Sequence, residues 1–194
     1  LDLDPARGDQ GVTKLEAEAG QTVKLAVYTH GAAELSGASL KVSFDTTQVA
    51  FEEAGDANGT ELHLLKSRPG ALTLFLPARL KENAVEFGGA ILSPTTSTVA
   101  AGDGLLGVLS FTTLEGYTGA RLVLEQVIFN SLDKVQDTLT VQSAALVAPP
   151  LDLLSQPKGL FSFDFDPASG DGEQFHLGEV GPGEEVNVEI YINE

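Results

Sequence analysis

Apolar and polar residues alternate with a period of two along most of this chain. Val23, Leu25 and Val27 alternate with Lys24, Ala26 and Tyr28. The same pattern recurs in three further sets, which are Leu40, Val42 and Phe44; Leu72, Leu74 and Leu76; and Val186, Val188, Ile190 and Ile192. This period predicts strands with one face on a core and the other towards water. Turn residues punctuate the pattern and no period of 3.6 is sustained, so we expect an all-β sandwich or barrel.

The turn residues also give the expected bounds of the strands. We expect strands near residues 1–4, 13–18, 21–30, 37–45, 48–53, 61–66, 71–76, 85–92, 105–114, 121–131 and 138–147, and again near 161–166 and 184–192. The best helix candidate, 77–84, would make two turns at most. Proline at 149, 150 and 157 cannot donate ladder hydrogen bonds, which predicts an extended linker. The chain therefore divides into a sandwich at 1–147, a linker at 148–160 and a C-terminal strand extension at 161–194.

The start of the chain recurs near its end. Residues 1–9 read LDLDPARGD and residues 163–171 read FDFDPASGD. Each leads into an alternating stretch, GQTVKLAVY at 20–28 and GEEVNVEIY at 183–191, with one extra residue in the second copy. The extension is therefore a partial repeat of the N-terminal strands.

Two strands without the rest of a sandwich leave apolar side chains and backbone groups unpaired. We expect the extension to pack on its own module, to begin a further module, or to complete the sheet of a neighbouring subunit by strand addition. The anchors would be its apolar positions, Phe163, Phe165, Val186, Val188, Ile190, Tyr191 and Ile192. Strand addition between like copies is head-to-tail and builds filaments unless its rotation closes.

The charge balance limits the partners. The net charge is −17, and residues 161–194 hold nine of the 28 acidic residues but none of the 11 basic ones. Such acidity repels phosphate backbones, so we expect no nucleic-acid partner. No apolar run has the length of a membrane span, so we expect no membrane insertion. The chain starts with Leu and contains no Met, so we expect a processed chain or a segment of a longer protein.

Both copies of the D-x-D-P-A-x-G-D motif are candidate calcium sites. On a strand, two carboxylates at i and i+2 share a face, and a third follows across a Pro/Gly turn. Hard carboxylate oxygens of this kind suit Ca²⁺. The candidate ligands are Asp2, Asp4 and Asp9 in the first copy, and Asp164, Asp166 and Asp171 in the second. In the alternative interpretation these residues only cap turns, and no other cofactor is expected.

Catalytic chemistry finds little support in the residues. The chain has no Cys and no G-x-S-x-G elbow. Glu52 and Glu53 are adjacent, so on a strand they point to opposite faces and make a poor acid pair. Three histidines, His30, His63 and His176, are not spaced as metal ligands. We therefore predict a non-enzymatic protein.

Three stretches resemble cohesin modules. They read AGQTVKLAVYTHG at 19–31, SGASLKVSFDTTQVAFEEA at 36–54 and GDGLLGVLSFTTLEGYTGARLVLEQVIF at 102–129. In the second, Phe44-Asp45 followed by Val49 and Phe51 is similar to the family's aromatic-Asp turn. The resemblance covers about residues 12–147 and implies an antiparallel sandwich of jelly-roll type with about nine strands.

The resemblance also implies a function and a cellular location. Cohesins are extracellular scaffolding modules that bind dockerins by one sheet face, so we expect a secreted bacterial-type protein at the cell surface. Our leading hypothesis is a structural subunit or surface module that assembles head-to-tail with copies of itself or adjacent modules. The alternative is a monomeric recognition module for a dockerin-like protein or a glycan. Trp is absent, and Tyr28 and Tyr191 occupy equivalent repeat positions, which favours a structural role over a sugar platform.

Overall fold

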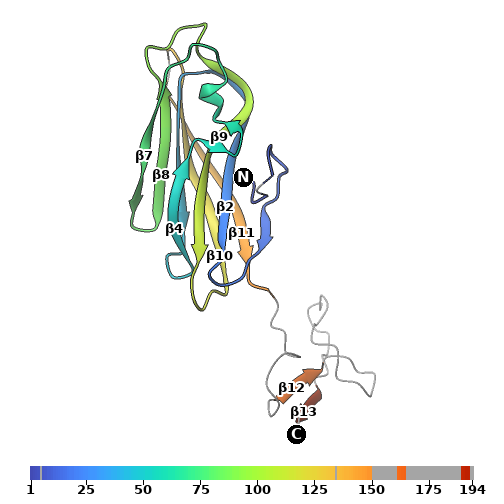
Figure 1. Ribbon diagram of the computed structural model, residues 1–194. Helices are drawn as coiled ribbons and strands as arrows, with labels where there is room; N and C mark the ends of the chain where they lie inside the picture. Colours follow the sequence, from blue (N-terminus) through green and yellow to red (C-terminus); the bar gives the residue numbers. More distant parts are fainter. Residues whose placement is uncertain (5, 134, 150–160, 165–188, 193–194) are drawn as a thin grey trace. The chain divides into compact units, whose positions relative to one another are not determined.

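A computed structural model describes residues 1–4, 6–133, 135–149, 161–164 and 189–192 of the chain. The chain divides into two compact units, Leu1–Pro149 and Pro150–Glu194. Within the described residues the elements are strands and one short 3-10 helix, η1 (Leu64–Lys66) (Figure 1). No helix of the described part is long and apolar enough to cross a membrane.

Two main sheets and one short strand pair make up the described first unit (Figure 1). The larger has six strands in the order β1 (Lys14–Glu16), β11 (Val135–Val147), β10 (Gly119–Asn130), β3 (Gly37–Phe44), β8 (Ala84–Ile91) and β7 (Thr73–Lys81). The smaller has the order β2 (Thr22–Leu35), β9 (Ala100–Thr113) and β4 (Val49–Gly55), and a short pair joins β5 (Ala57–Asn58) to β6 (Glu61–Leu62). Pairing is antiparallel except between β1 and β11. The predicted all-β sandwich of about nine strands is confirmed.

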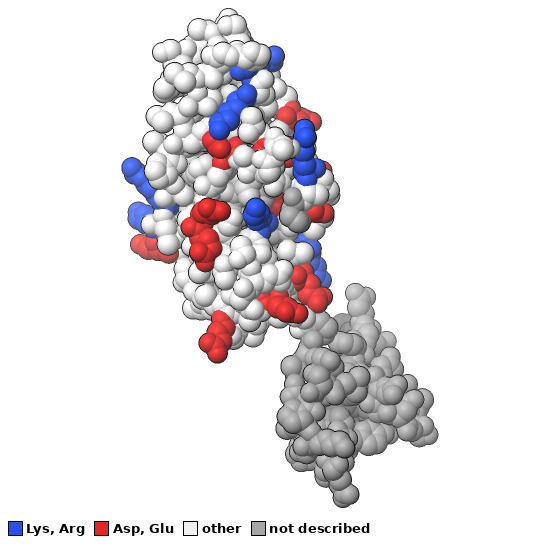
Figure 2. Space-filling view, in the orientation of Figure 1, with Lys and Arg blue, Asp and Glu red and all other residues white. Residues whose placement is uncertain are grey.

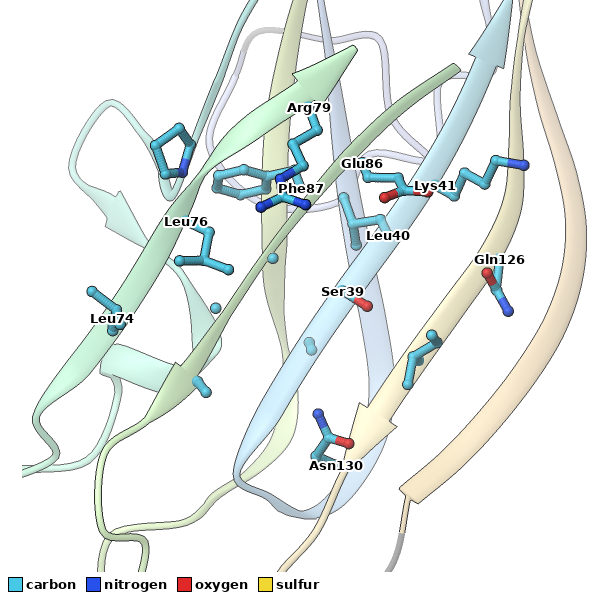
Figure 3. Close-up of a pocket in the computed structure, with 16 residues that line it drawn as sticks. Ser39, Leu40, Lys41, Leu74, Leu76, Arg79, Glu86, Phe87, Gln126 and Asn130 are labelled. Atoms are coloured by element: carbon cyan, nitrogen blue, oxygen red, sulfur yellow. The ribbon is translucent and has the colours of Figure 1, made fainter. Parts of the chain in front are cut away.

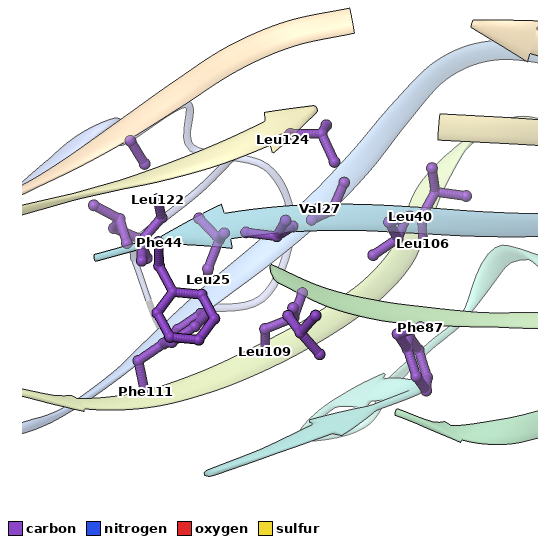
Figure 4. Close-up of a cluster of buried hydrophobic side chains, with 14 of the residues drawn as sticks. Leu25, Val27, Leu40, Phe44, Phe87, Leu106, Leu109, Phe111, Leu122 and Leu124 are labelled. Carbon is purple, nitrogen blue, oxygen red and sulfur yellow. The ribbon is translucent and has the colours of Figure 1, made fainter. Parts of the chain in front are cut away.

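The core lies between the two sheets, as the alternation predicts. Leu25 of β2 and Phe111 of β9 face Leu40 of β3 and Leu122 of β10, and all four are at most 3 % exposed (Figure 4). The ring of Phe111 packs edge-on against that of Phe44, with the centroids 5.1 Å apart. Each such side chain stabilises the fold by about 1.5–3 kcal/mol relative to an exposed position. Charged side chains of both signs are scattered over the visible surface among uncharged residues (Figure 2).

Some sequence expectations were wrong in detail. The stretch 77–84 is no helix but the end of β7 and its turn into β8. A register shift between Leu76 and Arg79 accommodates Pro77, which is tolerated on an edge strand. Residues 61–66 form β6 and η1 rather than one strand, and residues 1–4 make only an isolated bridge, between Asp2 and Ala26.

The second unit contains one antiparallel pair of described strands, β12 (Phe161–Asp164) and β13 (Glu189–Ile192). Asp164 is opposite Glu189 in this pair. In the sequence repeat, Asp164 corresponds to Asp2 and Glu189 corresponds to Ala26. Because Asp2 forms its antiparallel bridge with Ala26, both copies pair their first two segments in the same register.

Candidate functional site

A groove crosses the outer face of the larger sheet, over strands β10, β3, β8 and β7 (Figure 3). Its volume is about 460 Å³. Leu74, Leu76 and Arg79 border it along β7, and Gln126 and Asn130 border it along β10 (Figure 3). The opposite face of the same strands carries the core, so the sheet holds the groove rigidly in place.

Small residues make the floor of the groove. Ser39 of β3 is opposite Gly88 of β8, and Ala90 lies two residues further along β8. A Cβ atom on Gly88 would come within 2.6 Å of the Ala38 carbonyl oxygen and 2.7 Å of the Ser39 Cβ. This position therefore requires glycine, because the two strands approach too closely for a side chain. The result is a shallow floor between taller walls.

The wall on β7 consists of leucines that point away from the core. Leu74 and Leu76 are 50 % and 58 % exposed, whereas Phe75 between them packs inwards. The Phe75 ring stacks on the Phe87 ring at 6.1 Å, and Gly89 leaves room for it, since a Cβ there would come within 2.4 Å of the ring. Packing of Phe75 therefore forces its leucine neighbours outwards.

This orientation differs from the one the sequence predicts. The period-two pattern treats Leu72, Leu74 and Leu76 as the core-facing set of their strand. In the structure Leu72 is 67 % exposed, and Phe75 occupies the inward phase instead. Both phases of the stretch contain large apolar residues, so alternation alone could not choose between them. The period-two pattern therefore did not reveal the groove.

Charged groups lie at one end of the groove. Lys41 of β3 donates to Glu125 of β10 with Nζ 2.7 Å from Oε2. This hydrogen bond raises the pKa of Lys41 and lowers that of Glu125, so both stay charged near neutral pH. Arg79 of β7 and Glu86 of β8 are cross-strand partners at the same end. A partner in the groove would thus meet aliphatic walls and a polar end.

The first predicted calcium motif forms a tightly bonded loop. The Asp2 side chain is fully buried, and its carboxylate accepts the backbone N–H groups of Asp4 at 2.8 Å, Gln10 at 2.5 Å and Val12 at 3.3 Å. The Asp4 carboxylate accepts the N–H of Ala6. These contacts are the ones that the turn-capping interpretation requires.

Asp9 is engaged in the same way. One of its carboxylate oxygens accepts the N–H of Gly11 at 2.9 Å, and the other lies 2.9 Å from Nε2 of His30. No group of three or more His, Cys, Asp or Glu side chains among the described residues could hold a metal ion. Asp164 lies in β12, while Asp166 and Asp171 fall outside the described residues. The calcium sites stay a prediction.

Other elements hold the same N-terminal loop on the sandwich. The Glu61 carboxylate accepts both the N–H of Gly8 at 2.9 Å and the hydroxyl of Tyr28 at 2.8 Å. Burial, together with the hydrogen bond to Glu61, raises the pKa of Tyr28 to about 12. The side-chain amide of Asn58 donates to the carbonyl of Ala6 at 3.2 Å. Tyr28 therefore has the structural role that its place in the repeat suggests.

The predicted interface residues lie in the second unit. Phe163 belongs to β12, and Ile190, Tyr191 and Ile192 belong to β13. Phe165, Val186 and Val188 fall outside the described residues. The interface therefore stays a prediction.

Comparison with solved structures shows which known fold this sandwich shares. A non-cellulosomal cohesin from Archaeoglobus fulgidus matches with a TM-score of 0.50 and 15 % identity, covering 73 % of this chain and 89 % of that one. CaCohA2 from Clostridium acetobutylicum matches with a TM-score of 0.52 and 12 % identity, covering 70 % and 86 %. The third cohesin ScaC of Acetivibrio cellulolyticus, in complex with the ScaB dockerin, matches with a TM-score of 0.53 and 10 % identity, covering 70 % and 94 %.

The sequence comparisons add no relative to these. No family model matches the sequence. No curated protein matches it either. The structural likeness covers 70–73 % of this chain in each case and confirms the fold that the sequence motifs suggested. The chain contains a cohesin-like β-sandwich.

Proposed function

We propose that this chain is a non-enzymatic recognition module that binds a protein partner in the groove over β10, β3, β8 and β7. The carrying observation is the pair of outward leucines, Leu74 and Leu76, beside a floor of small residues. A soluble protein rarely leaves such side chains exposed together unless a partner covers them. One similar structure, the cohesin ScaC, was solved with a dockerin bound, which supports a protein as the partner.

The lining of the groove argues against a glycan ligand and against a glycoside substrate. Its apolar walls are aliphatic, and the lining contains no Tyr or Trp and only the buried Phe87, whereas sugar sites usually present exposed aromatic rings. Glu86 is the one acidic residue in the lining, and the nearby Glu125 is paired with Lys41 at 2.7 Å, so the groove presents no free pair of carboxylates for glycoside hydrolysis. A partner protein with small apolar side chains fits this surface best.

The test is capture of secreted and cell-surface proteins from the source organism. The bait is the full chain, compared with a Leu74→Asp/Leu76→Asp variant. We expect the variant to lose the captured partner, because two carboxylates would be buried against an apolar surface. Leu62→Asp is the matched control, since Leu62 is 53 % exposed but does not line the groove. Equal capture by all three baits would contradict the proposal, and capture of polysaccharide instead would favour a glycan ligand.

A second candidate is head-to-tail assembly outside the cell through the C-terminal unit. The shared register of Asp2 with Ala26 and of Asp164 with Glu189 supports it, because it identifies β12 and β13 as a second opening strand pair. In the sandwich, β2 pairs on its other side with β9. Among the described residues β13 pairs only with β12, so a strand from elsewhere would complete it.

Light scattering of the full chain and of a chain ending at Val147 tests this candidate. We expect the full chain to grow in mass with concentration and the shortened chain to stay monomeric. The same mass for both at every concentration would mean that the C-terminal unit does not mediate assembly. The groove proposal would then stand alone.

A further inference from the structure

Strand β7 is an open edge of the larger sheet. Within the described residues it pairs with β8 alone. The N–H of Leu92 donates to the carbonyl of Leu72 at 2.7 Å. Because antiparallel pairs alternate between bonded and non-bonded positions, the backbone groups of Thr73 and Phe75 are directed away from β8. An edge of this kind is a template for another strand.

The two halves of this edge differ in their protection. The second half carries Pro77, a register shift, Arg79 and Lys81, which are the usual devices against pairing. The first half, residues 72–76, has none of these and exposes three leucines, Leu72, Leu74 and Leu76. Unprotected apolar edges aggregate unless something covers them. The protection is confined to one half, so residues 72–76 stay open to pairing with another strand.

The charge around this edge identifies the kind of segment that fits. Residues 62–81 contain four basic residues and no acidic one, in a chain of net charge −17. Lys66 is paired with Asp56 at 2.7 Å, but no ion pair of the described residues engages Arg68, Arg79 or Lys81. Basic side chains reach the surface over the end of β7, at the left of the view in Figure 2. An acidic strand is therefore the complementary occupant.

We propose that the open edge at residues 72–76 pairs with β13 of a second copy of this chain. The proposal rests on the assembly candidate above and names the surface that receives the C-terminal unit. Residues 161–194 carry nine acidic residues and no basic one, which complements Arg68, Arg79 and Lys81 on and next to β7. Each strand also supplies what the other lacks, because β7 and β13 each have one side without a partner among the described residues.

Sedimentation velocity of the full chain over a range of concentrations tests this pairing. Thr73→Pro removes the outward N–H at the first residue of the strand, where proline does not disturb the ladder to β8. We expect self-association to weaken by roughly tenfold or more. This is the effect of losing one or two backbone hydrogen bonds to the incoming strand, which also fix its register. Thr73→Val is the matched control, since it keeps the N–H and should associate like the unmodified chain.

Charge variants at an exposed position supply a second measurement that does not depend on how Thr73→Pro folds. Leu72→Glu should weaken association with the acidic C-terminal unit, whereas Leu72→Lys should preserve or strengthen it at low salt.

The outcomes separate the two proposals. Assembly that is lost on shortening the chain to Val147 but is unchanged in Thr73→Pro and Leu72→Glu would overturn the β7 edge and leave assembly intact. A full chain that stays monomeric at every concentration would overturn both. Equal effects of Leu72→Glu and Leu72→Lys would also overturn the acidic occupant, because the surface would then respond only to lost apolar area.

Discussion

At the scale of single residues, Asp2 accepts more backbone hydrogen bonds than any other described side chain of the N-terminal loop. Its fully buried carboxylate satisfies three backbone N–H groups. Asp2→Ala would leave these donors unpaired, so we expect the free energy of unfolding to fall by about 2–4 kcal/mol. Asp4→Ala removes one exposed hydrogen bond and should cost less than about 1 kcal/mol. Denaturant unfolding measures both, and equal losses would show that burial of Asp2 adds nothing.

His63 makes the stability of the sandwich depend on pH. The side chain is fully buried, its Nδ1 accepts the N–H of Leu65 at 3.0 Å, and its ring packs against Phe75 at 4.7 Å. Burial lowers its pKa to about 4; Asp56 opposes this shift and Lys66 adds to it. In the unfolded chain the imidazole titrates near its usual value of about 6.5.

Protonation therefore favours the unfolded state between these two values. We expect the free energy of unfolding to fall as the pH drops from about 6.5 to about 4, by up to roughly 3 kcal/mol. His63→Gln keeps an acceptor for Leu65 but does not titrate, so its curve should be flatter over the upper part of this window. Chemical unfolding at a series of pH values measures the slope. Parallel curves for the two proteins would contradict the prediction.

At the scale of elements, the close approach of β3 and β8 determines the shape of the groove. Gly88→Ala would place a Cβ within 2.6 Å of the Ala38 carbonyl, so the strands must separate. We expect a loss of about 1–3 kcal/mol in the free energy of unfolding. Gly55→Ala in β4 is the matched control, because its Cβ would meet nothing within 4 Å. Thermal unfolding of the two variants checks the difference. A Gly88→Ala variant as stable as Gly55→Ala would show that β3 and β8 can separate without loss of stability.

Alternation predicted the strands whose two faces differ in polarity. Val23, Leu25 and Val27 of β2 are buried as expected, and so is the inward set of β3. The pattern failed at β7, where both faces are apolar and Phe75 rather than the leucines reaches the core. It also failed for 77–84, whose helix-forming residues were overridden by pairing with β8. A binding surface built on apolar residues therefore looks like core in sequence.

At the scale of the whole molecule, the chain combines one cohesin-like sandwich with a second opening strand pair. The repeat in the sequence is matched by pairing in the same register in both copies. Asp2 and Asp164 illustrate it, as each is opposite the corresponding residue of its partner segment. What the second pair contacts could not be deduced from the repeat. That depends on edges and charges that only the folded sandwich displays.

Net charge is the remaining property of the whole chain with a measurable consequence. With 28 acidic and 11 basic residues the folded molecule repels itself. Added NaCl screens this repulsion, so we expect the melting temperature to rise by a few degrees between about 0.01 M and 0.15 M salt. CaCl2 at matched ionic strength separates screening from specific binding at the six aspartates. A further rise with calcium that MgCl2 does not reproduce would confirm the predicted sites. Coinciding calcium and magnesium curves would mean that the six aspartates do not bind calcium specifically. No rise with NaCl would show that self-repulsion does not limit stability.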